Sequence, residues 1–385
     1  MILDTFTDIS RILEHDSTTT TYKYSLIKSV IESCREYPQY VTLNEETNRV
    51  TLPLGICVMK WLIDYYPFFI PGTFIALKHG EKKGGFQGVV FREYFEKVCS
   101  WYESPEHGGI SVFADDIIHG TVPREIVPVV VKLAALVRSA IVNGPMKHFG
   151  HSSSGEAFSV FRIESKAYPF KPSVPLSRRY LIERCGTYSI SKDLWLVFRD
   201  LGGFILGQGS VRQKWIDFLV RANAAEGVTE EEILKRFAMV PAFGRDVSDV
   251  SKVYQNEVKK GECVCVWSGK KLTLSTIAID HLFPFAVLKS NDLWNLVPVD
   301  ASVNLEKSDK VPSAEFLRER KAEILSCWSR LCAAYPTRFE EETVAGLLHG
   351  DFSGNWMERA FKELCRISEF LIRVRGCDVY TGKRR

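Results

Sequence analysis

Four side chains between residues 280 and 304 are of the types that hydrolyse a phosphodiester bond. Asp280 and His281 are adjacent, Asn295 follows His281 by 14 residues, and Asn304 follows Asn295 by 9. Cleavage needs a base that activates water and a cation that neutralises the phosphate and leaving oxygen. A neutral histidine accepts a proton near pH 7, and carboxylate and amide oxygens suit Mg²⁺ or Mn²⁺. We therefore expect His281 to act as general base, Asp280 and Asn304 to bind the metal, and Asn295 to hold the imidazole.

Basic residues near this segment are candidates for contacts with phosphate. Lys307 lies three residues after Asn304, and hence on the same face of a predicted helix. We expect it to hold a phosphate group. Further candidates precede or enter the segment, namely Arg245, Lys259, Lys260, Lys270 and Lys271. They could follow a nucleic-acid backbone or be solvated surface charges, and the same two readings apply to the basic C-terminal residues Arg373, Arg375, Lys383, Arg384 and Arg385.

Short elements must bring these groups together. Ile277 and Ile279 predict a strand that ends in Asp280 and His281, followed by a loop that contains Pro284. The loop reaches Asn295 within the sequence DLWNLVP, and the DASVN turn predicts the start of a helix that carries Asn304 and Lys307. A strand, a loop and a helix are sufficient to collect the four side chains in one place.

Residues 263–313 resemble the HNH, or ββα-metal, endonuclease superfamily, and most of all the HNH domain of the CRISPR RNA-guided effector nuclease. The resemblance rests on IDH at 279–281, on Asn295 and Asn304, and on NLEKSDKVPS at 304–313. It implies that the histidine is the general base, that the aspartate and the last asparagine bind one Mg²⁺, and that the middle asparagine supports the histidine. Asn304 stands where many relatives have a histidine, so the segment resembles the His-Asn-Asn subgroup.

The start of the segment departs from relatives that bind a structural zinc ion through two CxxC pairs. Cys263 and Cys265 form a CxC pair, and no second pair follows Asn295. We expect no structural zinc here. The CVWSGKKL sequence resembles the opening turn of the family, in which Ser268 and Gly269 shape the hairpin and Trp267 packs beneath it.

The rest of the chain predicts a mainly helical protein with a small α+β module. We expect a helical N-terminal recognition or regulatory region at 1–225, the nuclease module at 226–315 and a C-terminal helical region at 316–385. Just past the expected boundary at 225, Thr229 and Glu232 form a capping-box signature for a helix near Glu230. Apolar spacing predicts further helices at 22–34, 55–66, after Pro123, near 194–198, at 211–222 and at 247–258, and a strand pair or loops near 158–163.

Composition and charge do not decide whether the protein binds nucleic acid. The net charge of +3 and pI of about 8.2 neither require nor exclude nucleic acid. The ten cysteines lack the spacing of a secreted disulfide scaffold, the N-terminus lacks a signal peptide pattern, and Lys132 and Arg138 interrupt the apolar run at 126–142. We therefore expect a cytoplasmic protein outside the membrane. His148 and His151 have no carboxylate or cysteine at ligand spacing, which favours a structural or surface role.

Taken together, the residues and the resemblance predict a metal-dependent endonuclease that cuts nucleic acid, with DNA favoured over RNA. The TTTYKY and DLWNLVP sequences resemble, more faintly, bacterial HNH proteins associated with antiviral defence, which favours a defence or restriction-like effector. The alternative is a catalytically inactive HNH fold that binds DNA or another protein. Sequence specificity, the oligomeric state and the need for an activating protein or guide nucleic acid stay open.

Overall fold

The computed structural model describes residues 19–37, 40–85, 88–149, 159–207, 211–241, 247–288, 290–348 and 352–382. The chain divides into two compact units. The first comprises residues 1–35 and 40–242, and the second comprises residues 36–39 and 243–385. Of the candidates named from the sequence, Arg245, His151, Lys383, Arg384 and Arg385 lie outside the described residues.

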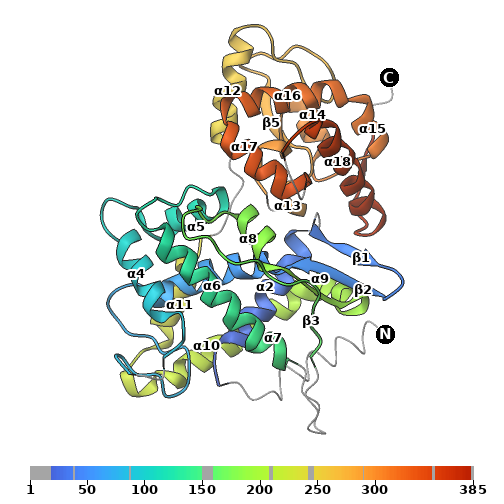
Figure 1. The fold of residues 1–385 in the computed structure, drawn as a ribbon. Coiled ribbons are helices and arrows are strands. Elements are labelled where there is room, and N and C mark those ends of the chain that lie inside the picture. The colour runs from blue at the N-terminus through green and yellow to red at the C-terminus, as the bar shows by residue number, and fades with distance from the viewer. Residues whose placement is uncertain are drawn as a thin grey trace. The chain divides into compact units, whose positions relative to one another are not determined.

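The first unit is mainly helical, as predicted, and also contains one small sheet (Figure 1). Its helices are α2 (Tyr22–Glu36), α3 (Leu54–Tyr65), α4 (Arg92–Tyr102), α5 (Gly109–His119), α6 (Val127–Asn143), α7 (Pro145–His148), α8 (Arg178–Cys185), α9 (Lys192–Leu206), α10 (Val211–Ala222) and α11 (Glu230–Met239), with short 3-10 helices η2 (Tyr66–Phe69) and η3 (Ala224–Glu226).

A four-stranded antiparallel sheet crosses the first unit in the order β1-β2-β4-β3. Its strands are β1 (Thr42–Asn44), β2 (Arg49–Pro53), β3 (Arg162–Ile163) and β4 (Thr187–Ser191). Val50 pairs with Ile190, and both side chains are fully buried. The predicted strand near 158–163 is β3, whereas its partner β4 follows only after a loop and α8. Two residues of β3 carry too little periodicity to identify that partner from the sequence.

Local signals placed several helices correctly. The Thr229 hydroxyl accepts the Glu232 amide N–H, and the Glu232 carboxylate accepts the Thr229 N–H, so the predicted capping box begins α11. The predicted helix at 55–66 is α3, which packs closely on α8 at Gly55. A Cβ at Gly55 would lie 2.3 Å from the Leu181 carbonyl carbon, so only glycine permits this approach.

The apolar run in the middle of the first unit forms α6 and α7. Among the described residues, the stretch Val127–His148 is long and apolar enough to cross a membrane by length and composition, and 39% of its most apolar window is buried. In this structure α6 packs against α3 and α4, and Val130, Leu133 and Val137 are fully buried there. The run therefore forms a core helix of this unit.

The second unit contains two small sheets and nine helical segments in its described part. Its elements are α12 (Ser248–Lys259), β5 (Ile277–His281), α13 (Phe285–Leu288), η4 (Leu293–Asn295), β6 (Leu296–Asp300), α14 (Ala301–Lys307), β7 (Val311–Pro312), α15 (Ala314–Glu319), α16 (Lys321–Ala334), α17 (Pro336–Thr343), the π-helical turn η5 (Val344–Leu348), α18 (Trp356–Arg373) and β8 (Val379–Tyr380).

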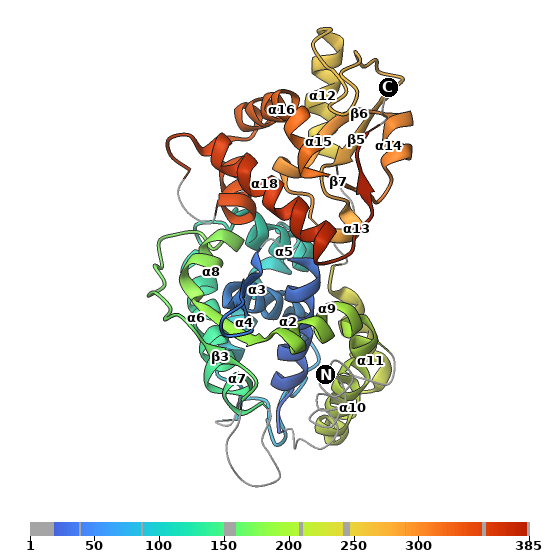
Figure 2. The same ribbon diagram turned by 90° about the vertical axis from the view of Figure 1, so that its right-hand side faces the viewer.

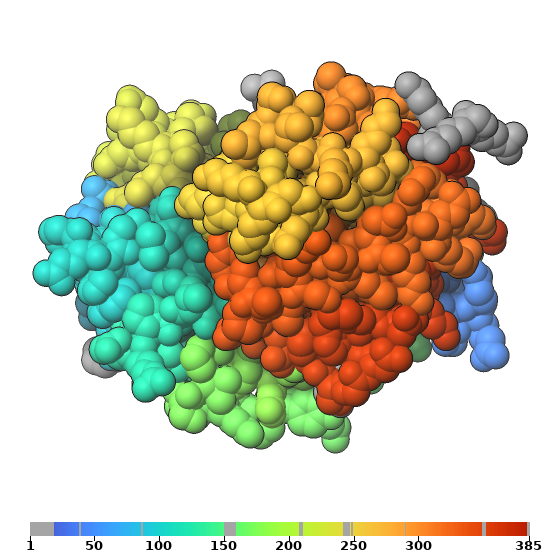
Figure 3. Space-filling view, turned by 90° about the horizontal axis from the view of Figure 1, so that it is seen from above, coloured from blue at the N-terminus to red at the C-terminus, as the bar shows by residue number. Residues whose placement is uncertain are grey.

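One hydrophobic core joins all parts of the second unit. Trp267 from the hairpin, Phe283 and Trp294 from the segment around the strands, and Trp328 and Phe361 from the C-terminal helices belong to the same buried cluster. In the space-filling view, the yellow segment around α12 lies against the orange and red C-terminal segments (Figure 3). The expected separation into a module ending at 315 and a helical region from 316 therefore differs from the structure, and the expected boundary at 225 falls before α11, which belongs to the first unit.

Candidate active site

An antiparallel strand pair positions the first two candidate residues. In β5 and β6, Asp280 pairs with Val297 and His281 pairs with Leu296. The Leu282 amide N–H donates to the Asn295 carbonyl oxygen at 2.7 Å, which extends the pairing past the end of β5. Neighbouring side chains on a strand point to opposite faces, so Asp280 and His281 meet different surroundings. Both are nearly inaccessible, with exposed fractions of 4% and 2%.

The Asp280 carboxylate accepts hydrogen bonds from two buried side chains. Trp267 Nε1–H donates to Oδ2 at 2.8 Å, and Lys307 Nζ lies 3.1 Å from Oδ2 and 3.3 Å from Oδ1. Lys307 Nζ also donates to the His281 carbonyl oxygen at 2.8 Å. These contacts hold a carboxylate and an ammonium together away from water, where each alone would be costly to bury. The Asp280 carboxylate is thus held at one position by two donors.

Lys307 does not occupy the place expected for a phosphate ligand. Its side chain is 0% exposed, and its ammonium is directed at Asp280 and at the His281 carbonyl oxygen. The prediction placed it correctly on the face of α14 that carries Asn304, but burial removes it from contact with a substrate backbone in this structure. We correct its role to that of a counter-charge for Asp280.

Asn304 brings a second oxygen donor to the same side of the unit. Helix α14 starts at an Asp300 cap, in which Oδ1 accepts the Ser302 amide N–H at 2.9 Å. The helix packs on β5 and β6 (Figure 2). Asn304 stands one turn before Lys307, which touches Asp280, so Asn304 shares the face directed at β5. Its half-buried side chain makes no hydrogen bond within the described part of the chain.

The donor set fits one hard divalent cation. Asp280 Oδ1 accepts only the long contact from Lys307, and the Asn304 amide oxygen has no donor among the described residues. Within the described ranges no three His, Cys, Asp or Glu side chains gather as a metal cage. A cation bound by two protein oxygens would keep several waters or take phosphate oxygens, which is how Mg²⁺ is commonly bound.

Asn295 holds the loop after the histidine. Its Oδ1 accepts the Phe283 amide N–H at 2.8 Å, and its Nδ2 donates to the Phe283 carbonyl oxygen at 3.0 Å. Asn295 is fully buried and both of its polar atoms are used in this way. We therefore correct the expectation that Asn295 orients the imidazole directly: it fixes the backbone two residues beyond His281.

Asn291 forms a hydrogen bond with the imidazole, and sequence reasoning did not identify it. His281 Nε2 lies 3.1 Å from Asn291 Oδ1, and the Phe285 ring packs beside the imidazole with centroids 5.7 Å apart. Asn291 stands in the loop between α13 and η4, where polar residues are ordinary, and its spacing from His281 carried no signal. Only the path of the loop brings it to the ring.

Comparisons with known proteins identify two families that match parts of the chain. Residues 265–313 match the family described as HNH endonuclease, and residues 3–237 match the family described as Domain of unknown function (DUF8808). The second match covers more than half of the chain. The chain belongs to the DUF8808 family. Its second unit carries an HNH domain, which confirms the family resemblance predicted from Asp280, His281, Asn295 and Asn304.

A curated relative shares similarity with part of the chain. It is the CRISPR-associated endonuclease Cas9 of Streptococcus mutans serotype c (strain ATCC 700610 / UA159), 32% identical over 117 residues. The alignment covers 28% of this chain and 8% of that relative. This DUF8808 protein therefore resembles Cas9 over part of its chain, and spans only a small part of the length of Cas9.

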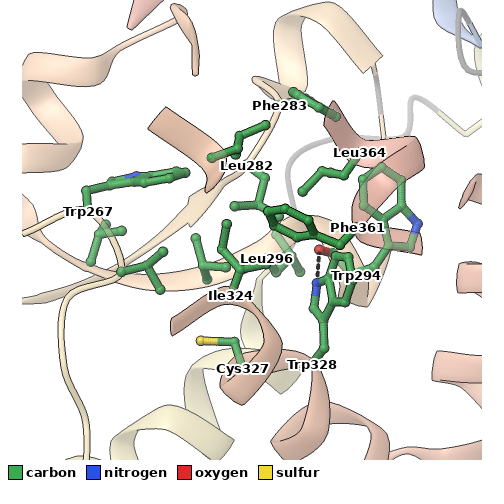
Figure 4. Close-up of a cluster of buried hydrophobic side chains, with 14 of the residues drawn as sticks. Trp267, Leu282, Phe283, Trp294, Leu296, Ile324, Cys327, Trp328, Phe361 and Leu364 are labelled. Carbon is green, nitrogen blue, oxygen red and sulfur yellow. Dashed lines mark hydrogen bonds between the residues drawn. The ribbon is translucent and has the colours of Figure 1, made fainter. Parts of the chain in front are cut away.

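The C-terminal helices brace the loop of the HNH domain that carries Asn291 and Asn295. The Leu293 amide N–H donates to Glu342 Oε2 of α17 at 2.6 Å, and Trp328 Nε1–H of α16 donates to the Trp294 carbonyl oxygen at 2.8 Å (Figure 4). A Cβ at Gly346 would lie 2.6 Å from Trp294 Nε1, so glycine allows η5 to approach the loop. The region expected to be a separate helical cap is thus part of the support of the site.

A buried ion pair strengthens this brace. Glu342 is 1% exposed, and Arg338 Nε donates to its Oε1 at 2.8 Å. Burial lowers the pKa of Arg338, but the neighbouring Glu342 outweighs burial and raises it, so the guanidinium stays charged. The Glu342 carboxylate is therefore held between a cation of α17 and the backbone of the loop.

The basic residues of the opening hairpin are exposed. Val264 pairs with Lys271 across the hairpin, and Lys270 and Lys271 both face solvent. Their placement leaves them available to a nucleic-acid backbone, and such contact stays a prediction. Lys260, at the end of α12, forms an ion pair with Glu257 at 3.1 Å. This contact favours the interpretation of Lys260 as a surface charge.

The CxC pair of the HNH domain is part of the core. Cys263 and Cys265 are both buried, and burial raises the pKa of the Cys263 thiol to about 11. A thiol with this pKa is protonated at neutral pH, whereas zinc binds the thiolate. The state of Cys263 gives no support to a zinc site, and the absence of zinc stays a prediction.

Proposed function

We propose that this protein is a metal-dependent HNH endonuclease that hydrolyses phosphodiester bonds in DNA, with His281 as general base. The proposal rests on one arrangement, in which Asp280 and His281 end β5 while Asn304 faces that strand from α14. The family match of residues 265–313 supports the nuclease class. The choice of DNA as substrate, the metal requirement and the biological role are parts of this proposal.

His281 would begin the reaction by taking a proton from a water molecule. The oxygen of that water forms a bond to phosphorus, the bond between phosphorus and the 3′ oxygen breaks, and the 3′ oxygen leaves with the electron pair and is protonated by solvent. A Mg²⁺ or Mn²⁺ ion held by Asp280 and Asn304 would supply positive charge at the phosphate and the leaving oxygen. Lys307 and Trp267 hold the Asp280 carboxylate in place.

Access to the base is a further part of the proposal. His281 is 2% exposed, so a phosphate group reaches the imidazole only after a neighbouring segment moves. This burial supports activation by a partner protein or nucleic acid, or by the substrate itself. It also suggests that the purified protein cuts slowly unless the activating partner is added.

The test is the nicking and linearisation of supercoiled plasmid by the full chain and by His281→Ala, with Mg²⁺, with Mn²⁺ and with EDTA. We expect cleavage that requires the metal and falls by about 10²–10⁴-fold in His281→Ala, which is the usual contribution of general acid–base catalysis. His148→Ala is the matched control, because His148 is exposed on α7 in the first unit and should not affect cutting.

Two results would overturn the proposal. Cleavage that persists in His281→Ala at the wild-type rate would remove His281 from the mechanism. Plasmid that is bound tightly but never cut, with and without added cell extract, would favour the inactive DNA-binding alternative. Faster cutting of a matched RNA substrate would keep the nuclease assignment and change its substrate.

We further propose a role in bacterial defence, within a reducing cytoplasm. The similarity of the HNH region to a protein described as CRISPR-associated supports the role. The ten cysteines are free thiols, and eight of them are buried, which fits a reducing compartment. Protection of host cells from phage that is lost in His281→Ala would test this setting.

A further inference from the structure

A groove in the first unit lies between α6 and the segment 167–172. Its volume of about 540 Å³ is within the range of pockets that hold small-molecule ligands. On the helix side it is lined by residues whose spacing places them on one face of α6, namely Pro128, Val131, Lys132, Ala135 and Arg138. The other side is formed by Ala167, Tyr168, Pro169, Phe170 and Pro172. Apart from two cations, these lining residues are apolar or aromatic.

The two cations bring positive charge that no carboxylate among the described lining residues balances. Lys132 is exposed and has no hydrogen bond or ion pair within the described part of the chain. Arg138 donates through Nε to the Cys185 carbonyl oxygen at 3.2 Å, and its guanidinium forms no ion pair with the described residues. A groove that carries charge of one sign attracts ligands of the opposite sign. The charge of this groove therefore favours an anionic ligand.

The positions of the cations favour an anion with more than one charge. Lys132 and Arg138 are six residues apart on α6, which corresponds to about 9 Å along the helix axis. A single carboxylate or phosphate group is compact, whereas a chain of phosphates carries negative charge over a longer distance. A polyphosphate can thus approach both side chains at once.

The wall opposite α6 offers an aromatic surface that is held in place. Tyr168 is 63% exposed, and its amide N–H donates to the Arg184 carbonyl oxygen at 2.9 Å. The Arg184 guanidinium lies 5.9 Å from the centre of the Tyr168 ring and 5.7 Å from that of Tyr180. The Phe170 ring packs on Tyr180 with centroids 5.8 Å apart. Exposed aromatic rings of this kind are the usual partners of stacked nucleobases.

We propose that this groove binds a nucleoside di- or triphosphate, with the base against Tyr168 and Phe170 and the phosphates at Lys132 and Arg138. The aromatic wall fits the base, and the two cations fit the phosphate chain. The inference goes beyond the proposed function, because no residue of the HNH domain lines the groove. Nucleotide binding and phosphodiester cleavage can therefore succeed or fail separately.

Calorimetric titration of the full chain with each common nucleoside 5′-diphosphate and 5′-triphosphate tests the proposal. EDTA is present throughout, so that metal binding and cleavage at the HNH domain do not contribute. We expect at least one nucleotide to bind, with an affinity that falls as salt is added, because ionic contacts are screened. Lys132→Glu and Tyr168→Ala should each weaken binding by about tenfold or more, through loss of a charged contact and of stacking respectively.

Lys147→Glu and Phe204→Ala are the matched controls. Lys147 is an exposed lysine of α7, Phe204 is a 75% exposed aromatic residue of α9, and neither is among the lining residues of the groove. Both variants should bind the nucleotide within about twofold of wild type, as is usual for surface substitutions away from a site. Circular dichroism checks that every variant is folded.

Three results would overturn the proposal. The first is that none of the nucleotides binds to the folded wild-type protein, or that the groove variants bind as tightly as the controls. The second is that inorganic triphosphate binds as tightly as the nucleotides, because the aromatic wall would then contribute nothing. The third is that a single-stranded oligonucleotide binds through Lys132 and Tyr168 much more tightly than any nucleotide, which would make a nucleic-acid strand the occupant.

Discussion

Each unit of this protein contains a buried ion pair, and the two differ in what surrounds the charges. In the first unit, Lys28 of α2 lies 2.8 Å from Asp64 of α3 and 2.8 Å from Glu32, and Lys60 lies 3.3 Å from Glu32. Two ammonium groups thus face two carboxylates. The cluster is electrically balanced by its own members and ties α2 to α3.

In the HNH domain, by contrast, the ion pair stands beside groups that are still able to bind something else. Asp280 is paired with Lys307, but the Asn304 side chain makes no hydrogen bond within the described residues. Burial of charge is therefore not by itself a mark of function. A functional site is indicated when a buried charge lies next to polar atoms, such as the Asn304 amide, that make no hydrogen bond within the described residues.

Removal of the aspartate from each ion pair gives the largest expected contrast. Asp280→Ala leaves the fully buried Lys307 without its carboxylate and should lower the free energy of unfolding by about 3–5 kcal/mol. Asp64→Ala should lower it by less, because Lys28 keeps its contact with Glu32. Only Asp280→Ala should also reduce plasmid cleavage, by about 10²-fold or more, because it removes a ligand of the metal ion that neutralises the reacting phosphate. Denaturant unfolding and cleavage per folded molecule measure the two effects. Loss of cleavage in folded Asp64→Ala would break the comparison.

Removal of the lysine should make the stability of the HNH domain depend on metal. In Lys307→Met the Asp280 carboxylate is buried without a cation, and a bound Mn²⁺ can replace the lost charge. Mn²⁺ should therefore raise Tm by several degrees more in Lys307→Met than in wild type, since about 1 kcal/mol corresponds to roughly 2–4 °C for a unit of this size. Lys28→Met is the control, and an equal Mn²⁺ response in both variants would contradict a metal site at Asp280.

The smallest effect concerns the acid stability of the first unit. Burial opposes ionisation of Glu32, but Lys60 and Lys28 outweigh it and lower its pKa from 4.5 to about 2. A folded pKa below the unfolded value means that Glu32 stabilises the fold above pH 4.5 and loses this contribution as the pH falls towards 2. The contribution is up to roughly 3 kcal/mol.

Hydrogen exchange of α2 and α3 as a function of pH measures this contribution. The difference in stability between wild type and Glu32→Gln should be greatest above pH 5 and should shrink between about pH 4.5 and pH 2. Glu45→Gln, which breaks an exposed ion pair with Lys192, is the control and should change stability little at any pH. A difference that does not depend on pH would show that Glu32 acts through packing alone.

Much of the fold could be predicted because helices depend on local signals. The Thr229 capping box and the apolar spacing of α2, α3, α10 and α12 lie within a few residues of the elements they define. The pairing of β2 with β4 was not predicted, because about 140 residues separate Arg49 from its partner Ser191. The boundaries of the units were also misplaced, since a shared core between 265–313 and the C-terminal helices leaves no periodic trace in the sequence.

The sequence by itself determined which residue types stand at the family positions, because the spacing of Asp280, His281, Asn295 and Asn304 belongs to one short strand, loop and helix. The tertiary structure alone decided how three polar side chains are used. Lys307 turned inward to Asp280, Asn295 bonded to the Phe283 backbone, and Asn291 reached the imidazole. The reason is physical: a buried polar group takes the partner that the packed chain brings within about 3 Å, and that partner is set by the path of the loops in space.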